Sequence, residues 1–136
     1  MNRFDRAISK LVKAFFEGDL EKGDCARCAV GNICDGRNEW GDVFYTALEG
    51  QIIDIDNYFG LSKYVIDKTG YSWQELAKIE NSFELNTEIH HNKYRRFSKS
   101  AIMEDQYNGL MAVVDVLCEI EGIESGETKK LFEYQS

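Results

Sequence analysis

A long, broadly apolar segment, SAIMEDQYNGLMAVVDVLCEIEGI at residues 100–123, most limits what this chain can fold into. Its apolar residues recur at helical spacing and lie around most of the helix circumference: Ile102, Met103, Leu110, Val113, Val114, Leu117 and Ile120. A helix that is apolar on most sides is stable only when neighbouring elements cover it. Gly122 is a typical residue to end such a helix. We therefore expect a central helix here, with the other elements packed around it.

Two further stretches predict substantial helices. Residues 4–15 carry apolar side chains in an i, i+3/i+4, i+7 pattern and precede Gly18, so we expect an amphipathic helix that ends near this glycine. The segment SWQELAKIENSFELNTEI, residues 72–89, also has helical spacing. It begins with an S-x-x-E capping box made by Ser72 and Glu75, which marks the start of a helix.

Shorter elements fill the remaining chain. GLSKYVIDKTG at residues 60–70 predicts a short helix, and Ser125 can cap a last one. The β-forming runs VFYTAL and QIIDI predict a short β-hairpin near residues 43–55. The predicted fold is therefore mostly α (α+β): a compact bundle of about four main helices with one short β-hairpin, in a single globular domain over residues 1–136.

Composition places the chain among globular proteins and limits its function. With 43% hydrophobic and 29% charged residues, 136 residues are enough for one well-packed core. No apolar run approaches the length that crosses a bilayer. The formal net charge of −8 disfavours nucleic-acid binding, because affinity for phosphate backbones comes from Lys and Arg. Four cysteines without a recognisable export signal predict a reducing, cytoplasmic setting.

Three of the four cysteines lie close together, as Cys25-x-x-Cys28 followed by Cys34. Two thiolates at the first spacing can share one tetrahedral zinc ion, which makes these three the candidate metal ligands. A closed site needs a fourth ligand, and the options are Cys118, His90, His91 and Asp35. In a continuous helix Cys34 would lie about 180° from Cys25. All three can therefore meet one ion only if the helix is broken, for example at Gly31.

Two other interpretations of this stretch stay open. If Asp24 caps a helix that begins near Cys25, the helix N-terminus and Arg27 would lower the thiol pKa and favour redox chemistry. Alternatively, the cysteines fill the core beside a short packing helix. The apolar stripe of that helix is Ala26, Ala29, Val30 and Ile33. The absence of an obvious fourth metal ligand favours the packing helix.

Residues 90–99, HHNKYRRFSK, are strongly basic although the chain as a whole is acidic. The segment holds four cations and no acidic residue, with two aromatic residues among the cations. Its candidate binding residues are Lys93, Tyr94, Arg95 and Arg96. Arginines beside aromatic rings suit an acidic partner protein or a small phosphate-bearing ligand. The same cations could instead neutralise the acidic body of this chain, as charge runs usually do.

One further motif, Glu88-x-x-His91, is half of the carboxylate di-iron signature of four-helix bundles. The signature needs a second copy and two more glutamates, and this chain holds the motif once. The available acids are Glu104, Asp105, Asp115 and Glu119. We therefore expect a surface helix end at this motif. No phosphate-binding glycine loop or complete calcium loop occurs, and nothing in the sequence brings a nucleophilic triad together, so we expect no enzymatic activity.

The chain also carries the stretches NRFDRAISKLVKAFFEG, TGYSWQELAKIE and IMEDQYNGLMAVVDVLCEIEGI. Together they resemble a group of small proteins from gut anaerobes, their phages and their mobile elements, for which no activity is established. The resemblance implies a cytosolic, phage-linked context and carries over no site residue. We expect a small non-enzymatic interaction or regulatory protein that docks a protein partner through its acidic helical body and its basic-aromatic loop. A zinc-binding module and a pocket for a small anionic ligand are the alternatives.

Overall fold

The computed structural model describes residues 2–24, 27–35 and 66–134 of the chain. Within these ranges every regular element is helical. The three long helices are α1 (Arg3–Glu17), α5 (Trp73–Leu85) and α6 (Lys99–Glu121). The short elements are α2 (Ala29–Ile33), α7 (Gly126–Lys129) and the 3-10 helices η2 (His91–Arg96) and η3 (Lys130–Phe132). The predicted β-hairpin near residues 43–55 lies outside the described residues, as does most of the helix predicted over 60–70, of which residues 66–69 are helical.

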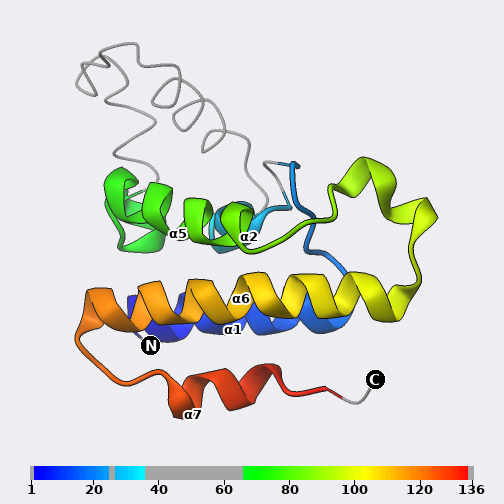
Figure 1. Ribbon diagram of the computed structural model, residues 1–136. Helices are drawn as coiled ribbons and strands as arrows, with labels where there is room; N and C mark the ends of the chain where they lie inside the picture. Colours follow the sequence, from blue (N-terminus) through cyan, green and yellow to red (C-terminus); the bar gives the residue numbers. More distant parts are fainter. Residues whose placement is uncertain (1, 25–26, 36–65, 135–136) are drawn as a thin grey trace, which may run out of the picture.

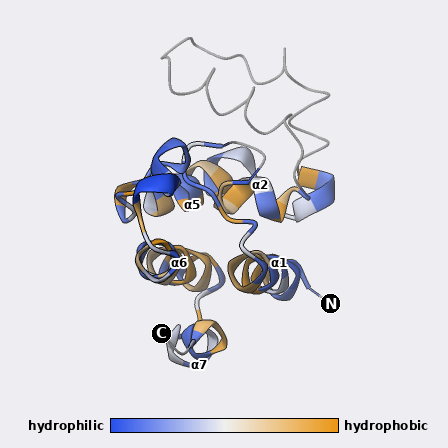
Figure 2. Ribbon diagram, turned by 90° about the vertical axis from the view of Figure 1, so that its right-hand side faces the viewer, coloured by the Kyte–Doolittle hydropathy of each residue, from blue (hydrophilic) through white to orange (hydrophobic). Residues whose placement is uncertain are grey.

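The helices pack in three layers, which are visible in Figures 1 and 2. Helices α1 and α6 lie side by side in the middle, α2 and α5 cover one side of this pair, and α7 lies on the other. The fully buried residues of α6 are Leu110, Val113, Val114 and Leu117. The prediction of a central helix over residues 100–123 is therefore confirmed. No helix in the described ranges is long and apolar enough to cross a membrane.

The predicted helix boundaries at Gly18, Ser72 and Gly122 are confirmed. Helix α1 ends at Gly18 and α6 at Gly122, and both glycines have the left-handed backbone conformation of a helix C-cap. The capping box of α5 is complete, because Ser72 Oγ accepts from the Glu75 N–H at 3.1 Å and Glu75 Oε1 accepts from the Ser72 N–H at 2.8 Å. Local sequence therefore determines where these three helix ends lie.

Helix α5 is shorter than predicted, because it ends at Leu85 and not at residue 89. Beyond it, the carboxylate of Asp105 on α6 accepts from the backbone N–H groups of Glu88 and Ile89, at 2.8 and 2.9 Å. A charged acceptor from another helix thus satisfies donors that would otherwise need partners inside α5. The chain then turns away from α5 toward η2.

Helices α5 and α6 approach closely at Gly109. A Cβ atom at this position would lie 2.4 Å from Cγ2 of Thr87 and 2.9 Å from Cδ1 of Phe83. Phe83 is fully buried, and the Thr87 hydroxyl donates to the Phe83 carbonyl at 2.8 Å. Glycine is therefore required for the close packing of these two helices.

Candidate functional site

The basic segment predicted from the sequence forms η2, which follows α5 and precedes α6 in the chain and lies at the end of the molecule where α6 begins (Figure 1). The side chains of Lys93, Arg95 and Arg96 are all exposed. Within the described ranges none of the three takes part in an ion pair. In this part of the chain, neutralisation by the protein's own acidic body is therefore not observed.

Tyr94 holds η2 in place. Its hydroxyl donates to the Leu20 carbonyl at 3.4 Å and accepts from Nε2 of Gln106 at 3.0 Å. Gln106 itself is buried and also donates to the Leu20 carbonyl. Burial raises the pKa of Tyr94, which keeps the hydroxyl protonated and able to donate. Of the four predicted binding residues, Tyr94 therefore anchors the surface that the three cations form.

Residues 19–24 support the first turn of η2. The Lys22 carbonyl accepts from the His91 N–H at 2.9 Å, and the Lys22 ammonium donates to the carbonyls of Glu84 and Thr87. Gly23 packs directly on His90, because a Cβ at Gly23 would lie 2.1 Å from Nε2 of that histidine. No local pattern indicated this contact, since the two segments are far apart in the sequence.

An apolar groove of about 410 Å³ lies beside η2, between the end of α1 and the start of α6. We call it the Phe16–Phe97 groove after its two exposed phenylalanines, which keep 47% and 46% of their surface accessible. Its remaining lining residues are Phe15, Glu17, Gly18, Glu21, Tyr94, Lys99, Ile102, Met103 and Gln106. No local sequence pattern indicates this groove, because α1 and Phe97 come together only in the folded chain.

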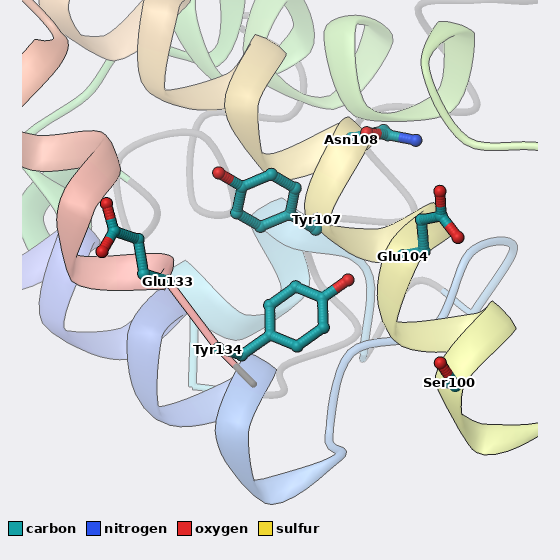
Figure 3. Close-up of a pocket in the computed structure, with 6 residues that line it drawn as sticks. All are labelled: Ser100, Glu104, Tyr107, Asn108, Glu133 and Tyr134. Atoms are coloured by element: carbon teal, nitrogen blue, oxygen red, sulfur yellow. The ribbon is translucent and has the colours of Figure 1, made fainter. Parts of the chain in front are cut away.

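A second groove, of about 610 Å³, lies between α6 and the segment after η3 (Figure 3). It is lined by Ser100, Glu104, Tyr107 and Asn108 of α6 and by Glu133 and Tyr134. The rings of Tyr107 and Tyr134 meet edge to face with their centroids 5.5 Å apart, and Glu104 and Glu133 lie on opposite sides of this pair. Carboxylates beside aromatic ring faces suit a positively charged group, so this groove has the opposite charge preference to η2.

The cysteine stretch differs from the predicted helix. Helix α2 begins at Ala29, and Cys28 is its N-cap, with Sγ accepting from the Gly31 N–H at 3.2 Å. The prediction that Asp24 caps this helix is wrong, because the Asp24 carbonyl instead accepts from the N–H groups of Arg27 and Cys28 in a preceding turn. Gly31 lies inside α2 and does not interrupt it. The described residues therefore do not form one continuous helix from Cys25 to Cys34. The predicted angle of about 180° between these two cysteines assumed such a helix.

Glu80 of α5 is buried against α2 with 2% of its surface exposed, and no motif in the sequence marks it. Its Oε1 accepts from the Val30 N–H at 3.1 Å. Burial raises the pKa of Glu80 to about 8, with a further contribution from the nearby Glu84. Hydrogen bonds from Val30 and from the Cys28 thiol act in the opposite direction. Glu80 thus links α5 to the N-terminal end of α2.

The other candidate zinc ligands lie apart. Cys28 and Cys34 are buried at the two ends of α2. Asp35 pairs with Lys10 and Lys68, which lower its pKa although burial acts against them. The thiol of Cys118 lies on α6 near α7, where burial raises its pKa and a hydrogen bond involves Thr128. No group of three or more potential ligands comes together in the described ranges, and Cys25 lies outside them. The three-cysteine site stays a prediction.

The di-iron ligand set is also dispersed. Glu88 follows the end of α5 and is not on a helix. Asp105 uses both carboxylate oxygens on backbone N–H groups, while Asp115 and Glu119 pair with Lys129 and Lys78. The available acids thus stabilise helix ends and helix contacts. Glu104 remains, and it faces the second groove.

Comparison with protein-family models, curated proteins and solved structures finds no match for this chain. No known site can therefore be carried over onto its residues. The surfaces of the described part of the chain include the exposed cations of η2, with the apolar groove beside them, and the acidic groove between α6 and the C-terminal segment.

Proposed function

We propose that this chain is a small non-enzymatic interaction protein that docks a protein partner through η2, with its acidic helical body as a secondary contact surface. The observation that carries the proposal is the state of Lys93, Arg95 and Arg96, which are exposed and without an ion pair in the described part of the chain. Unpaired cations gathered on one small element can steer and orient an acidic partner.

Charge pairing in the remainder of the molecule also supports η2 as the surface that binds an acidic partner. Many cations of the helical body already have partners, namely Arg3, Lys10, Arg27, Lys68, Lys78, Lys129 and Lys130. The chain as a whole carries a formal charge of −8, which repels nucleic acid and favours a compact acidic patch over an extended polyanion. The proposal includes a cytosolic setting, which the cysteine content also favours, and a link to phages or mobile elements, which rests on the sequence resemblance alone.

The proposal is tested with two charge-matched triple variants. Lys93→Gln, Arg95→Gln and Arg96→Gln remove the η2 cations, whereas Lys78→Gln, Lys129→Gln and Lys130→Gln remove three cations that are paired in the fold. Partners captured from a bacterial lysate are identified by mass spectrometry, purified and measured for direct binding as NaCl is raised.

The η2 variant is expected to lose affinity by about tenfold or more, which corresponds to about 1.4 kcal/mol, while the control variant keeps it. Binding of the native chain should also weaken with salt. Equal capture by both variants, or capture that disappears with nuclease treatment, would contradict the proposal.

A pocket for a small phosphate-bearing ligand has less support. Neither groove described above is lined by Lys93, Arg95 or Arg96. These cations are exposed and lie outside both grooves, an arrangement that suits a macromolecule better than a small anion. Thermal shift with nucleotides tests this alternative, because a bound ligand raises the apparent stability of the folded chain. An equal shift in the η2 triple variant would exclude these cations as the ligand site.

A zinc-binding module is the second candidate, and one contact favours it. His90 packs on Gly23, which opens the cysteine-containing stretch GDCARC. Zinc per chain, measured by elemental analysis after purification without a chelator, tests this candidate directly. A stoichiometric signal that disappears in the Cys25→Ser, Cys28→Ser double variant and persists in Cys118→Ser would establish it. Absence of zinc from the native chain would end it.

A further inference from the structure

The Phe16–Phe97 groove is continuous along the chain with the basic surface of η2. Phe97 directly follows Arg96, and Lys99 lies on the same wall of the groove. Like the cations of η2, Lys99 has no ion pair with a described residue. Along the chain, the half-exposed Phe97 thus stands between two cations that have no ion pair with a described residue. This combination suits an apolar side chain that carries acidic neighbours.

The opposite wall of the groove has a different character. It is formed by the end of α1, where Phe16 lies beside the buried ring of Phe15 with a centroid distance of 5.1 Å. Glu17 and Glu21 belong to this wall, and Glu21 pairs with Arg27. One wall of the groove therefore carries a cation, Lys99, and the other carries the two acids Glu17 and Glu21. An acidic ligand would bind with its carboxylates toward Lys99 and η2 and away from the end of α1.

We infer that the Phe16–Phe97 groove docks an amphipathic segment of an acidic partner protein. Bulky apolar side chains of that segment enter the groove and contact Phe16, Phe97 and Met103, while flanking Asp or Glu side chains face Lys99, Arg95 and Arg96. This inference rests on the proposed function and names the kind of partner surface involved. The groove supplies the apolar anchor, and the cations set its orientation.

Display of random 12-residue peptides against the intact chain tests this inference without a known partner. Selected peptides are expected to combine aromatic or leucine residues with flanking acids. Their affinities are then compared on Phe16→Ser and Phe97→Ser and on the controls Leu85→Ser and Leu131→Ser, which remove exposed apolar side chains outside the groove. Each groove variant should weaken binding about tenfold, and each control should leave it within about twofold.

A second measurement locates the peptide even if one variant folds poorly. The chain has three methionines, of which Met103 lines the groove and Met111 lies farther along α6. With 13C-labelled methionine methyl groups in the native chain, a bound peptide should shift the Met103 signal and leave that of Met111 in place. Shifts at Met111 alone would show that the peptide binds elsewhere and would overturn the inference.

The outcomes separate the inference from the proposed function. If acidic peptides bind through the η2 cations but keep their affinity for both phenylalanine variants, the groove is not the docking site. The proposed function would not be affected by this result. Peptides that need the phenylalanines but not the cations would overturn both. Selection of basic or uncharged peptides, or of none, would reject an acidic partner. Tighter binding of a single-stranded oligonucleotide, or a dimer of this chain that Phe97→Ser dissociates, would assign the groove to another occupant.

Discussion

The carboxyl group of Glu80, almost completely buried, accepts a hydrogen bond from the backbone N–H of Val30 at 3.1 Å. This bond joins the middle of α5 to the start of α2, a helix of only five residues. Helix N-termini favour a nearby negative charge, but burial of Glu80 has the larger effect and raises its pKa to about 8. Burial of Glu80 therefore makes the stability of this region depend on pH.

Stability should fall as pH rises through the range in which the folded and unfolded states differ in protonation of Glu80. The ordinary pKa of 4.5 applies to the unfolded chain and about 8 to the folded one, so the folded state binds the extra proton between these values. The contribution of Glu80 is complete below about pH 4.5 and is lost as pH rises to about 8, by up to about 1.4 kcal/mol per pH unit.

Glu80→Gln keeps the shape of the side chain and removes this titration. We expect urea unfolding to show that the free energy of unfolding of the variant, minus that of the native chain, increases from pH 5 to about pH 8. Between pH 8 and 9 this difference should stay constant. Glu104→Gln, at an exposed carboxylate of α6, is the control and should follow the native chain. A constant difference between Glu80→Gln and native over the whole range would contradict the prediction.

Gly109→Ala should destabilise the fold, because the new methyl group would overlap Thr87 and Phe83 at the contact between α5 and α6. Overpacking of this kind costs about 1–3 kcal/mol, more than the gain in helix propensity that alanine brings. Gly126→Ala in α7 is the matched control, since no atom lies within 4 Å of its added Cβ. Chemical denaturation of both variants measures the difference, and an equally stable Gly109→Ala would show that the helices can separate at little cost.

Tyr94→Phe should loosen η2 and leave the three long helices unchanged. The substitution removes one hydroxyl that bonds to Leu20 and Gln106, for an expected loss of about 0.5–1.5 kcal/mol. Hydrogen exchange should accelerate at the amides of η2 and of residues 19–24 in particular. Tyr107→Phe is the control, because its hydroxyl makes no hydrogen bond to a described residue. Unchanged exchange rates in η2 would show that the Tyr94 hydroxyl does not hold η2 in place.

Cys28→Ser should be more stable than Cys28→Ala, by about 1 kcal/mol, because serine can replace the thiol as the N-cap of α2. A cysteine that merely filled the core would give the opposite order, since alanine buries no polar group. Thermal unfolding of the two variants under reducing conditions decides between these roles. The order of the two midpoints is the informative quantity, and alanine above serine would rule out the capping role.

Local patterns were sufficient where a helix is determined by its own residues. Helical spacing and terminal glycines predicted α1 and α6, and the pair Ser72 and Glu75 predicted the start of α5. The predictions were wrong at the start of α2 and at the end of α5. At the end of α5, Asp105 from a distant helix accepts hydrogen bonds from the N–H groups of Glu88 and Ile89, which no local pattern shows. At the start of α2, the Cys28 thiol accepts from the Gly31 N–H, and cysteine is not among the residues that usually cap a helix.

The basic character of residues 90–99 was evident from composition, but composition does not show whether these cations pair with acids of the same chain. Whether Lys93, Arg95 and Arg96 face acidic groups of the same chain depends on where η2 packs. That position follows from Tyr94, Gln106 and residues 19–24, which lie far apart in the sequence. The same long-range packing brings Phe16 and Phe97 to one groove and buries Glu80 against α2. Helix formation is thus encoded locally, whereas exposure, charge pairing and burial depend on contacts between distant segments.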